Sequence, residues 1–350
     1  MVSDGLPLRV RDILSCTVRF KHHNVIRRNM ISVGVNGLGR IGRSAVHQVA
    51  ESTDIELEAV NDLMDREDAE YLLNHDTVHQ RQNQVTKTNN GLEIGDKTVT
   101  YSQNRDPESL DWNDLDLVFE CTGQFRSSDG CSKIPGKKVV ISAPPRDGAT
   151  DQYVYGVNHT NYSGERVVSG ASCTTNSAAP PLEVLDNLFG IESAEMATVH
   201  AYTGSQNLVG GSNTKTRRGR AAAENIVPTG TGASEAVTEV LPELENSFDA
   251  TAYRVPVPDG SITHITARLA EDVASDQLKT VLEDEASRRP ELDATRNSLV
   301  SSDIIGTEAA SILDLEKCST DSGLARLAAW YDNETGYTAQ MLRLGRHIAR

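Results

Sequence analysis

The chain has 350 residues, of which 38% are hydrophobic, and its formal net charge is −16. A chain of this length exceeds one typical hydrophobic core and favours two domains. No apolar run reaches the roughly 18 residues of a membrane span, and a net-negative surface repels nucleic-acid phosphates. We therefore expect a soluble protein that binds neither membranes nor nucleic acids.

Surface charge and cysteine usage point to the cellular environment. Fifty acidic residues oppose 34 basic ones, and only nine of the basic residues are lysines. Dense hydrated carboxylates favour solubility in concentrated salt, so we expect a halophilic source, with an ordinary acidic protein as the alternative. Five cysteines without a CxxC pair argue against disulfides and structural zinc. Because no secretion signal is present, we expect free thiols in the cytoplasm and no metal.

Residues 1–29 differ in charge from the rest of the chain. They carry six basic and two acidic residues, and a new strand pattern opens at Met30. We expect this segment to be disordered. We interpret it as an over-long gene assignment with Met30 as the natural start; a genuine basic arm is the alternative.

Strands and helices alternate from Met30 onward. Apolar strands are expected at residues 31–35, 56–60, 115–119 and 138–142, and the first is followed by a helix with its apolar residues on one face. This alternation indicates βαβ units and a mostly parallel sheet.

A glycine-rich turn joins the first strand to its helix. The run Gly37-Leu38-Gly39-Arg40-Ile41-Gly42 is a G-x-G-x-x-G motif, whose glycines allow a pyrophosphate to approach the backbone at the helix N-terminus. Asp62 lies 20 residues after Gly42, where a carboxylate can bind an adenosine ribose. Together they predict a dinucleotide site; a glycine turn with an unrelated surface aspartate is the alternative.

Cys173 follows a short strand at residues 167–169 and precedes an apolar, helical run at 182–189. A cysteine at the turn into a helix lies in the positive field of the helix end, which favours thiolate over thiol. Pro180 and Pro181 complicate this helix because each removes a backbone donor. The hydroxyls and amides around Cys173 favour a nucleophile over a buried structural cysteine.

The second half of the chain has longer strands, at residues 195–200, 263–269 and 325–331, with a helix at 276–285 and a terminal helical stretch at 337–350. This mixture suggests an α+β domain.

His200 ends the first of these longer strands, where a base that reaches the Cys173 sulfur could lie. The two side chains could work as thiolate and imidazolium. The following loop, residues 201–220, has no acidic residue and four basic ones, Lys215, Arg217, Arg218 and Arg220. We expect this loop to bind phosphates or an acidic neighbouring subunit; a solvated basic loop is the alternative.

Five segments, in order, resemble phosphorylating glyceraldehyde-3-phosphate dehydrogenases. They are residues 35–43 (VNGLGRIGR), 171–176 (ASCTTN), 198–200 (TVH), 220–224 (RAAAE) and 330–337 (WYDNETGY). The resemblance implies a Rossmann-type doubly wound α/β domain at 30–172 and an α+β catalytic domain with a mixed sheet at 173–336. It also implies a helix at 337–350 that returns to the first domain, and a homotetramer.

Carried over by motif, the resemblance makes Cys173 the nucleophile and His200 the base. It implies that the cofactor, NAD or NADP, is bound by Gly37, Gly39, Arg40, Ile41, Gly42, Asp62, Arg105, Ser142 and Asn333. It implies that inorganic phosphate contacts Ser172, Thr174, Thr231 and Gly232. The substrate phosphate would contact Thr203 and Arg254.

The resemblance also implies the reaction. Cys173 attacks the aldehyde of glyceraldehyde 3-phosphate, His200 takes the hydroxyl proton as hydride leaves for the nicotinamide, and inorganic phosphate cleaves the thioester to 1,3-bisphosphoglycerate.

Two positions depart from the family pattern. Ser205 stands where many members carry an acidic residue, and Gly211-Ser212 stands where strictly NAD-using members often have Leu-Pro. The second departure is associated with tolerance of NADP, whereas the Asp62 carboxylate repels the 2′-phosphate of NADP. We expect NAD preference with some NADP use.

Three alternative functions remain open at this stage. Erythrose-4-phosphate dehydrogenase shares the fold and the nucleophile but lets water release the acid. A non-catalytic cofactor-sensing regulator would have no use for both Cys173 and His200. A cysteine hydrolase gives no role to the glycine-rich turn and Asp62.

Overall fold

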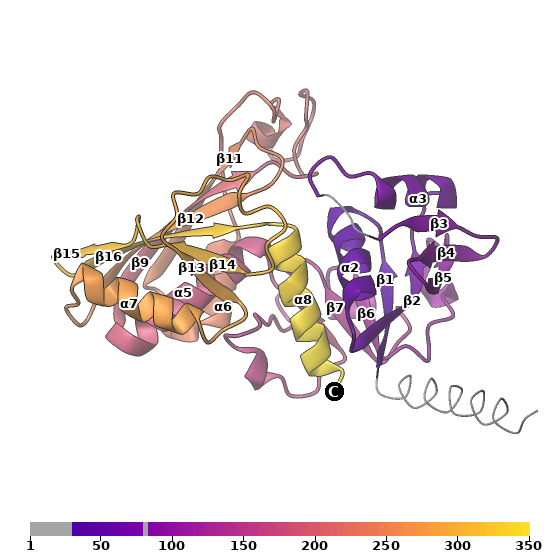
Figure 1. The fold of residues 1–350 in the computed structure, drawn as a ribbon, viewed down its shortest axis with the longest axis horizontal. Coiled ribbons are helices and arrows are strands. Elements are labelled where there is room, and N and C mark those ends of the chain that lie inside the picture. The colour runs from indigo at the N-terminus through magenta and orange to yellow at the C-terminus, as the bar shows by residue number, and fades with distance from the viewer. Residues whose placement is uncertain (1–29, 80–82) are drawn as a thin grey trace, which may run out of the picture.

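The computed structural model describes residues 30–79 and 83–350. The extension at residues 1–29 lies outside the described residues, so its expected disorder stays a prediction. The described chain forms two eight-stranded sheets, and the terminal helix α8 (Thr335–Ile348) runs between them (Figure 1). No helix in these described ranges is long and apolar enough to cross a lipid bilayer.

The first sheet is mostly parallel, as predicted. Its strand order is β3-β4-β5-β2-β1-β6-β7-β8. The strands are β1 (Ile31–Asn36), β2 (Ile55–Asn61), β3 (Val85–Lys87), β4 (Gly91–Ile94), β5 (Lys97–Ser102), β6 (Leu117–Glu120), β7 (Lys138–Ile141) and β8 (Val167–Ser169). In this sheet order, all neighbouring strands from β5 through β2 and β1 to β8 pair in parallel, and β3 and β4 add an antiparallel edge. The carboxyl ends of the parallel strands therefore meet at one edge, where ligands bind in such folds.

Three helices, two of them labelled in Figure 1, connect strands of this sheet and contact it in the described part of the chain. They are α2 (Arg40–Glu51), α3 (Arg66–Asn74) and the short α4 (Ser128–Cys131), with 3₁₀ turns η1 (Pro107–Ser109) and η2 (His159–Asn161). The predicted helical face of α2 is confirmed, because Ala45, Val46 and Val49 are buried in the core of this sheet.

The second sheet is mixed. Its order is β10-β11-β9-β12-β16-β14-β13, and β15 pairs with β16. The strands are β9 (Ile191–Ala201), β10 (Val227–Thr229), β11 (Phe248–Val255), β12 (Ser261–Leu269), β13 (Leu292–Thr295), β14 (Ser311–Asp314), β15 (Ser319–Asp321) and β16 (Leu324–Tyr331). Strand β9 pairs in parallel with β11 and antiparallel with β12.

Helices α5 (Cys173–Phe189), α6 (Ala233–Val240) and α7 (Ser275–Ala286) accompany the second sheet, with 3₁₀ turns η3 (Thr216–Gly219) and η4 (Pro242–Leu244). The apolar sides of these helices share one core with strands β9, β12 and β16. Helix α8 packs on α2 and also contacts β7 and α5, so the C-terminus lies against the first sheet. The boundaries drawn at residues 30–172, 173–336 and 337–350 stay predictions.

Candidate active site

Cys173 is the first residue of helix α5. The helix therefore begins at the cysteine rather than at residue 182, and it continues through Pro180 and Pro181. Ser172 caps it, because its Oγ accepts a hydrogen bond from the backbone N–H of Thr175 at 3.0 Å. This places the sulfur beside backbone N–H groups of the first turn that have no helical acceptor.

The turn into α5 is tight. Ala171 has a φ of 55°, a left-handed conformation that is uncommon outside glycine. Two side chains hold it: the Asn176 amide donates to the carbonyls of Gly170 and Ser172, both at 2.9 Å, and the Tyr337 hydroxyl donates to the Ala171 carbonyl at 3.2 Å. The position of Cys173 is thus set by α8 as well as by its own helix.

The structure brings Cys173 and His200 together, with 3.4 Å between Sγ and Nε2. The other ring nitrogen, Nδ1, lies 2.7 Å from the Ala201 carbonyl. Donation of Nδ1–H to that carbonyl leaves Nε2 as an acceptor for the thiol proton.

Strand β11, which the sequence pattern did not reveal, pairs with β9 so that Arg254 lies opposite His200. The Arg254 Nη1 is 3.0 Å from Nδ1.

Burial sets the charge state of this pair. It lowers the pKa of His200 to about 3, and the Arg254 and Arg218 charges act in the same direction. Burial also raises the pKa of the Cys173 thiol, against which the Arg254 charge and hydrogen bonds from Thr174 act. Burial therefore favours the neutral thiol and the neutral imidazole, and the use of the pair as thiolate and imidazolium stays a prediction.

Two guanidinium groups approach each other beside the pair. Arg254 Nη1 donates to the Thr203 hydroxyl at 3.4 Å, and Arg218 Nη1 donates to the Ser205 hydroxyl at 3.1 Å. The two hydroxyls lie 2.9 Å apart. Among the described residues neither arginine has a carboxylate partner, and Nε of Arg254 is buried without an acceptor. Two unpaired cations joined by hydroxyls are suited to bind a phosphate dianion.

The basic loop divides at this point. Arg218 enters the site, whereas Lys215, Arg217 and Arg220 are exposed. The sequence indicated the loop but could not single out Arg218, because its direction depends on hydrogen bonds to Thr229 and Gly230.

The predicted phosphate residues lie at different depths. Ser172 and Thr203 line the same cavity as Cys173. Thr174 is buried, and its hydroxyl lies 3.3 Å from that of Tyr331. Thr231 and Gly232 precede α6, where the Thr231 hydroxyl accepts from the Ala233 N–H, and they do not line that cavity. Their contact with inorganic phosphate stays a prediction.

The predicted cofactor residues lie along two cavities that meet at the glycine-rich turn. The first, of about 560 Å³, contains Cys173 and is also lined by Arg40, Ile41, Ser142 and Asn333. The second, of about 710 Å³, is lined by Gly37, Gly39, Asp62 and Arg105. Gly42 lines neither, because it packs under the turn, where a Cβ would lie 1.8 Å from the Gly37 carbonyl.

The turn fits a dinucleotide. Gly37 has a φ of 97°, which favours glycine, and a Cβ on Gly39 would meet no atom within 4 Å. Helix α2 has no side-chain cap and no acidic residue in its first turn, so no side chain there competes with an anion for its N-terminal N–H groups. Asp62 accepts hydrogen bonds from the N–H groups of Leu38 and Met64, at 2.6 and 3.0 Å, which fixes its carboxylate at the cavity.

The Arg40 guanidinium is already paired within the chain. It forms ion pairs with Asp76 and Glu334, so the groups of Arg40 and Ile41 available to a pyrophosphate are their backbone N–H groups. Asn333 is held beside the first cavity, because its Oδ1 accepts from the Ser261 hydroxyl at 2.6 Å.

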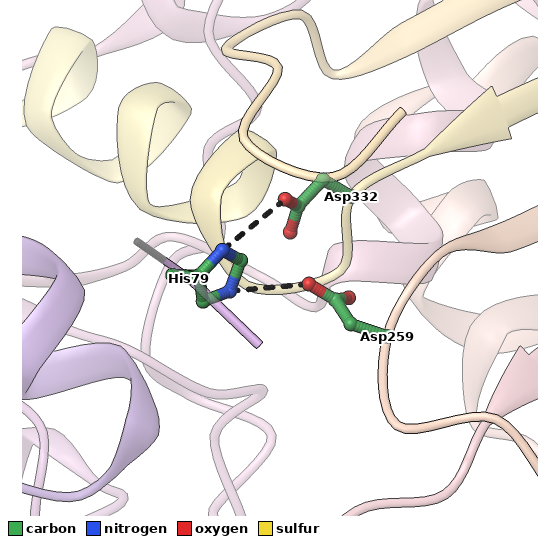
Figure 2. Close-up of side chains that lie close together, drawn as sticks. All are labelled: His79, Asp259 and Asp332. Carbon is green, nitrogen blue, oxygen red and sulfur yellow. Dashed lines mark ion pairs between the residues drawn. The ribbon is translucent and has the colours of Figure 1, made fainter. Parts of the chain in front are cut away.

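Sequence reasoning missed a buried cluster next to Asn333. His79 lies between Asp259 and Asp332, which face different nitrogens of its ring (Figure 2). Nε2 is also 2.9 Å from a Glu334 carboxylate oxygen. Asp332 and Glu334 were visible in the WYDNETGY run, but neither His79 nor Asp259 carried a signal of its own.

Comparisons with known proteins agree along most of the chain. A family model described as "Glyceraldehyde 3-phosphate dehydrogenase, NAD binding domain" matches residues 31–128, and the model of the C-terminal domain of the same family matches residues 172–333. A glyceraldehyde-3-phosphate dehydrogenase from Haloarcula vallismortis is 44% identical over 328 residues, covering 91% of this chain and 98% of the relative.

Enzymes of the same name from Shimwellia blattae and Bacteroides fragilis are each 39% identical, over 330 and 332 residues, covering 91% of this chain and 99% of each relative. The chain thus combines an NAD-binding domain, a matching C-terminal domain and a cysteine–histidine pair at their junction, and it belongs to the glyceraldehyde-3-phosphate dehydrogenase family of oxidoreductases.

Proposed function

We propose that the chain oxidises glyceraldehyde 3-phosphate with NAD and phosphorylates the product to 1,3-bisphosphoglycerate, in glycolysis or gluconeogenesis. The observation that carries the proposal is the 3.4 Å contact between Cys173 Sγ and His200 Nε2, at a cavity that reaches the glycine-rich turn. The names of the curated relatives agree with this activity and do not favour erythrose 4-phosphate.

The first step is formation of a hemithioacetal at Cys173. The neutral His200 imidazole accepts the thiol proton, and Sγ bonds to the aldehyde carbon. The adjacent Arg254 charge favours the transient thiolate, because it acts to lower the pKa of the thiol. Backbone N–H groups at the start of α5 lie next to Sγ and stabilise the oxyanion that forms on the substrate.

The second step oxidises this adduct. Bound NAD supplies the hydride acceptor. The His200 imidazolium first returns its proton to the oxyanion, and the neutral imidazole then removes this hydroxyl proton as the carbonyl of the thioester forms. A low pKa keeps its imidazole unprotonated and able to accept that proton across the working pH range.

The third step is attack of inorganic phosphate on the thioester, with Cys173 as the leaving group. Thr203 with Arg254 would hold the substrate phosphate, and Arg218 with Ser172 would hold the attacking phosphate. These two assignments are supported by the guanidinium groups of Arg218 and Arg254, which lie beside the cavity without a carboxylate partner among the described residues.

Asp62 supports a preference for NAD over NADP, because its carboxylate is fixed at the second cavity and repels an added 2′-phosphate. Gly211 and Ser212 line neither cavity. We expect some NADP use and a lower kcat/KM for NADP than for NAD; an equal or higher value for NADP would contradict this preference.

A reduction assay tests the activity. Purified protein is given glyceraldehyde 3-phosphate or erythrose 4-phosphate, with NAD or NADP, and with phosphate, arsenate or neither. We expect fast NAD reduction with glyceraldehyde 3-phosphate that requires phosphate or arsenate. Activity on erythrose 4-phosphate that ignores added phosphate would favour the rival dehydrogenase.

Assembly and environment belong to the same proposal. Val199 and Tyr253 on neighbouring strands of the second sheet, and Val209 in the basic loop, are exposed apolar residues that support a homotetramer. The net charge of −16 supports a salt-rich cytoplasm. Light scattering and melting curves over a range of KCl concentrations test both. A monomer, or a fold that is indifferent to salt, would contradict them.

A further inference from the structure

The cluster around His79 connects three parts of the chain. His79 follows α3 in the first sheet's half of the molecule, Asp259 lies between β11 and β12, and Asp332 and Glu334 lie between β16 and α8 (Figure 1). His79, Asp259 and Asp332 are almost fully buried. The first cavity runs past this junction and is lined there by Val78 and Glu334.

The imidazole has a carboxylate near each ring nitrogen (Figure 2), and on the Nδ1 side the Thr335 hydroxyl is nearer, at 3.4 Å. Nε2 is 2.9 Å from Glu334 Oε2 and 3.2 Å from Asp259 Oδ2, and Nδ1 is 4.0 Å from Asp332 Oδ2. Apart from the His79 ring, Oδ2 of Asp259 has no hydrogen-bond partner in the described part of the chain. A buried carboxylate oxygen is costly unless a donor or a cation lies beside it, and the His79 ring fills that position for Asp259.

All three carboxylates bracket Asn333. Asp332 and Glu334 are its neighbours in the chain, and the Asn333 N–H donates to Asp259 Oδ1 at 3.2 Å. Asp332 Oδ1 also accepts the N–H groups of Glu334 and Thr335, which starts α8. The backbone of Asn333 is thus fixed through groups that meet at one imidazole.

Glu334 extends the same contacts to the glycine-rich turn. Its carboxylate accepts from Arg40 Nε at 2.9 Å and from Arg40 Nη2 at 2.5 Å, and Arg40 is the first residue of α2. Arg40 in turn pairs with Asp76, whose Oδ1 accepts the N–H of His79 at 2.9 Å. Contacts from His79 therefore reach Arg40 by two routes, through Glu334 and through Asp76.

We propose that His79 is a positioning residue that, as an imidazolium, holds Asn333 in place for the nicotinamide end of the cofactor and Arg40 in place for its pyrophosphate. The inference rests on the proposed function of Asn333 in that cavity. A divalent cation is the competing occupant of the cluster, but Asp259 and Asp332 face different ring nitrogens, which suits a doubly protonated ring better than one shared ion.

The surroundings agree with a charged ring. The groups that face it are the carboxylates of Asp259, Asp332 and Glu334, with Arg40 and Asp76 beyond them. Hydrogen bonds to Asp259 and Glu334 raise the pKa of His79 to about 9, although burial opposes them. The cofactor contact should therefore weaken as the pH rises through about 9.

Equilibrium binding of NAD, measured without substrate, tests the proposal. We expect His79→Gln to weaken NAD binding about 10- to 100-fold, the loss typical of removing a partner behind a ligand-contacting group. The rate of Cys173 alkylation by iodoacetamide should stay within about twofold of the unsubstituted protein. His75→Gln is the matched control, because His75 is exposed in the same segment, and it should change neither quantity.

A pH profile separates positioning from general destabilisation. The unsubstituted protein should lose NAD affinity above pH 9, His79→Gln should show no such limb, and His79→Lys should recover part of the affinity at pH 7. If His79→Gln does not fold, Asp259→Asn replaces it. In that variant the loss of NAD affinity should begin at a lower pH.

Three results would overturn the proposal: unchanged NAD affinity in His79→Gln, a flat profile through pH 10, or about one Zn²⁺ or Mn²⁺ per chain whose removal by a chelator weakens NAD binding. Because the readout is binding, a protein that binds NAD as described but does not oxidise glyceraldehyde 3-phosphate would contradict the proposed function and leave this inference standing.

Discussion

Two buried histidines occupy opposite electrostatic surroundings in this molecule. His200 lies beside Arg254 and has no carboxylate partner among the described residues, and its pKa falls to about 3. His79 lies among Asp259, Asp332 and Glu334, and its pKa rises to about 9. Burial acts in the same direction on both rings. The difference therefore shows that the neighbouring charges decide whether a buried imidazole serves as a base or as a fixed cation.

The largest expected effect concerns the thiol that His200 faces. Cys173→Ser should lower dehydrogenase activity by at least about 10⁴-fold, because the alcohol is a much weaker nucleophile next to the same base. Steady-state kinetics measure the loss. NAD binding and the melting temperature should stay unchanged, and more than a tenth of the original activity would show that the thiol is not the nucleophile.

The base itself comes next. His200→Asn should lower kcat about 10²- to 10⁴-fold, and alkylation of Cys173 at neutral pH should slow, since no neutral imidazole remains to take the thiol proton. The measurements are kcat and the iodoacetamide rate. His79→Gln gives the contrast, because it should spare alkylation. Equal alkylation rates in His200→Asn and the unsubstituted protein would refute the role of His200.

Arg254→Gln tests the effect of the positive charge beside His200. Loss of this charge should raise the KM for glyceraldehyde 3-phosphate about tenfold or more. It should also move the alkylation midpoint of Cys173 to higher pH, because Arg254 acts to lower the pKa of that thiol. Arg217→Gln, in an exposed part of the basic loop, is the control and should change neither. A midpoint that moves to lower pH would contradict the electrostatic assignment.

The smallest expected effect is on the stability of the fold, through the carboxylate cluster around His79. The pKa of His79 rises from 6.5 to about 9 on folding, so its stabilisation is fully present below pH 6.5 and is lost as the pH rises through 9. A shift of this size corresponds to at most about 3 kcal/mol. Burial and Asp259 raise the pKa of Asp332 to about 7, which also favours the fold at lower pH.

Thermal unfolding between pH 6 and 10 measures this dependence. The melting temperature of the unsubstituted protein should fall over that range, and that of His79→Gln should fall less. Parallel curves for the two proteins would show that the ring carries no charge in the folded state.

The sequence predicted the positions that carry local patterns. The glycine-rich turn, the strand alternation and Cys173 at a strand-to-helix turn each depend on a few consecutive residues. The His79 cluster depends on three segments that are far apart in the chain and meet only when the two sheets pack against each other. The parallel pairing of β9 and β11, which places Arg254 beside His200, is likewise a tertiary contact without a local signal.

The charge state of Cys173 could not be predicted from the sequence for a related reason. The helix N-terminus, which the sequence shows, favours a thiolate, whereas burial, which only the fold shows, raises the pKa of the thiol. The two effects act in opposite directions on this thiol, and the second depends on tertiary packing.

Mass spectrometry of the protein mixed with glyceraldehyde 3-phosphate and NAD in the absence of phosphate tests the central claim most directly. We predict one phosphoglyceroyl group bound as a thioester on the peptide that contains Cys173, and its rapid release as 1,3-bisphosphoglycerate when inorganic phosphate is added. An adduct on another residue, or release as the free acid at the same rate with and without phosphate, would contradict the account.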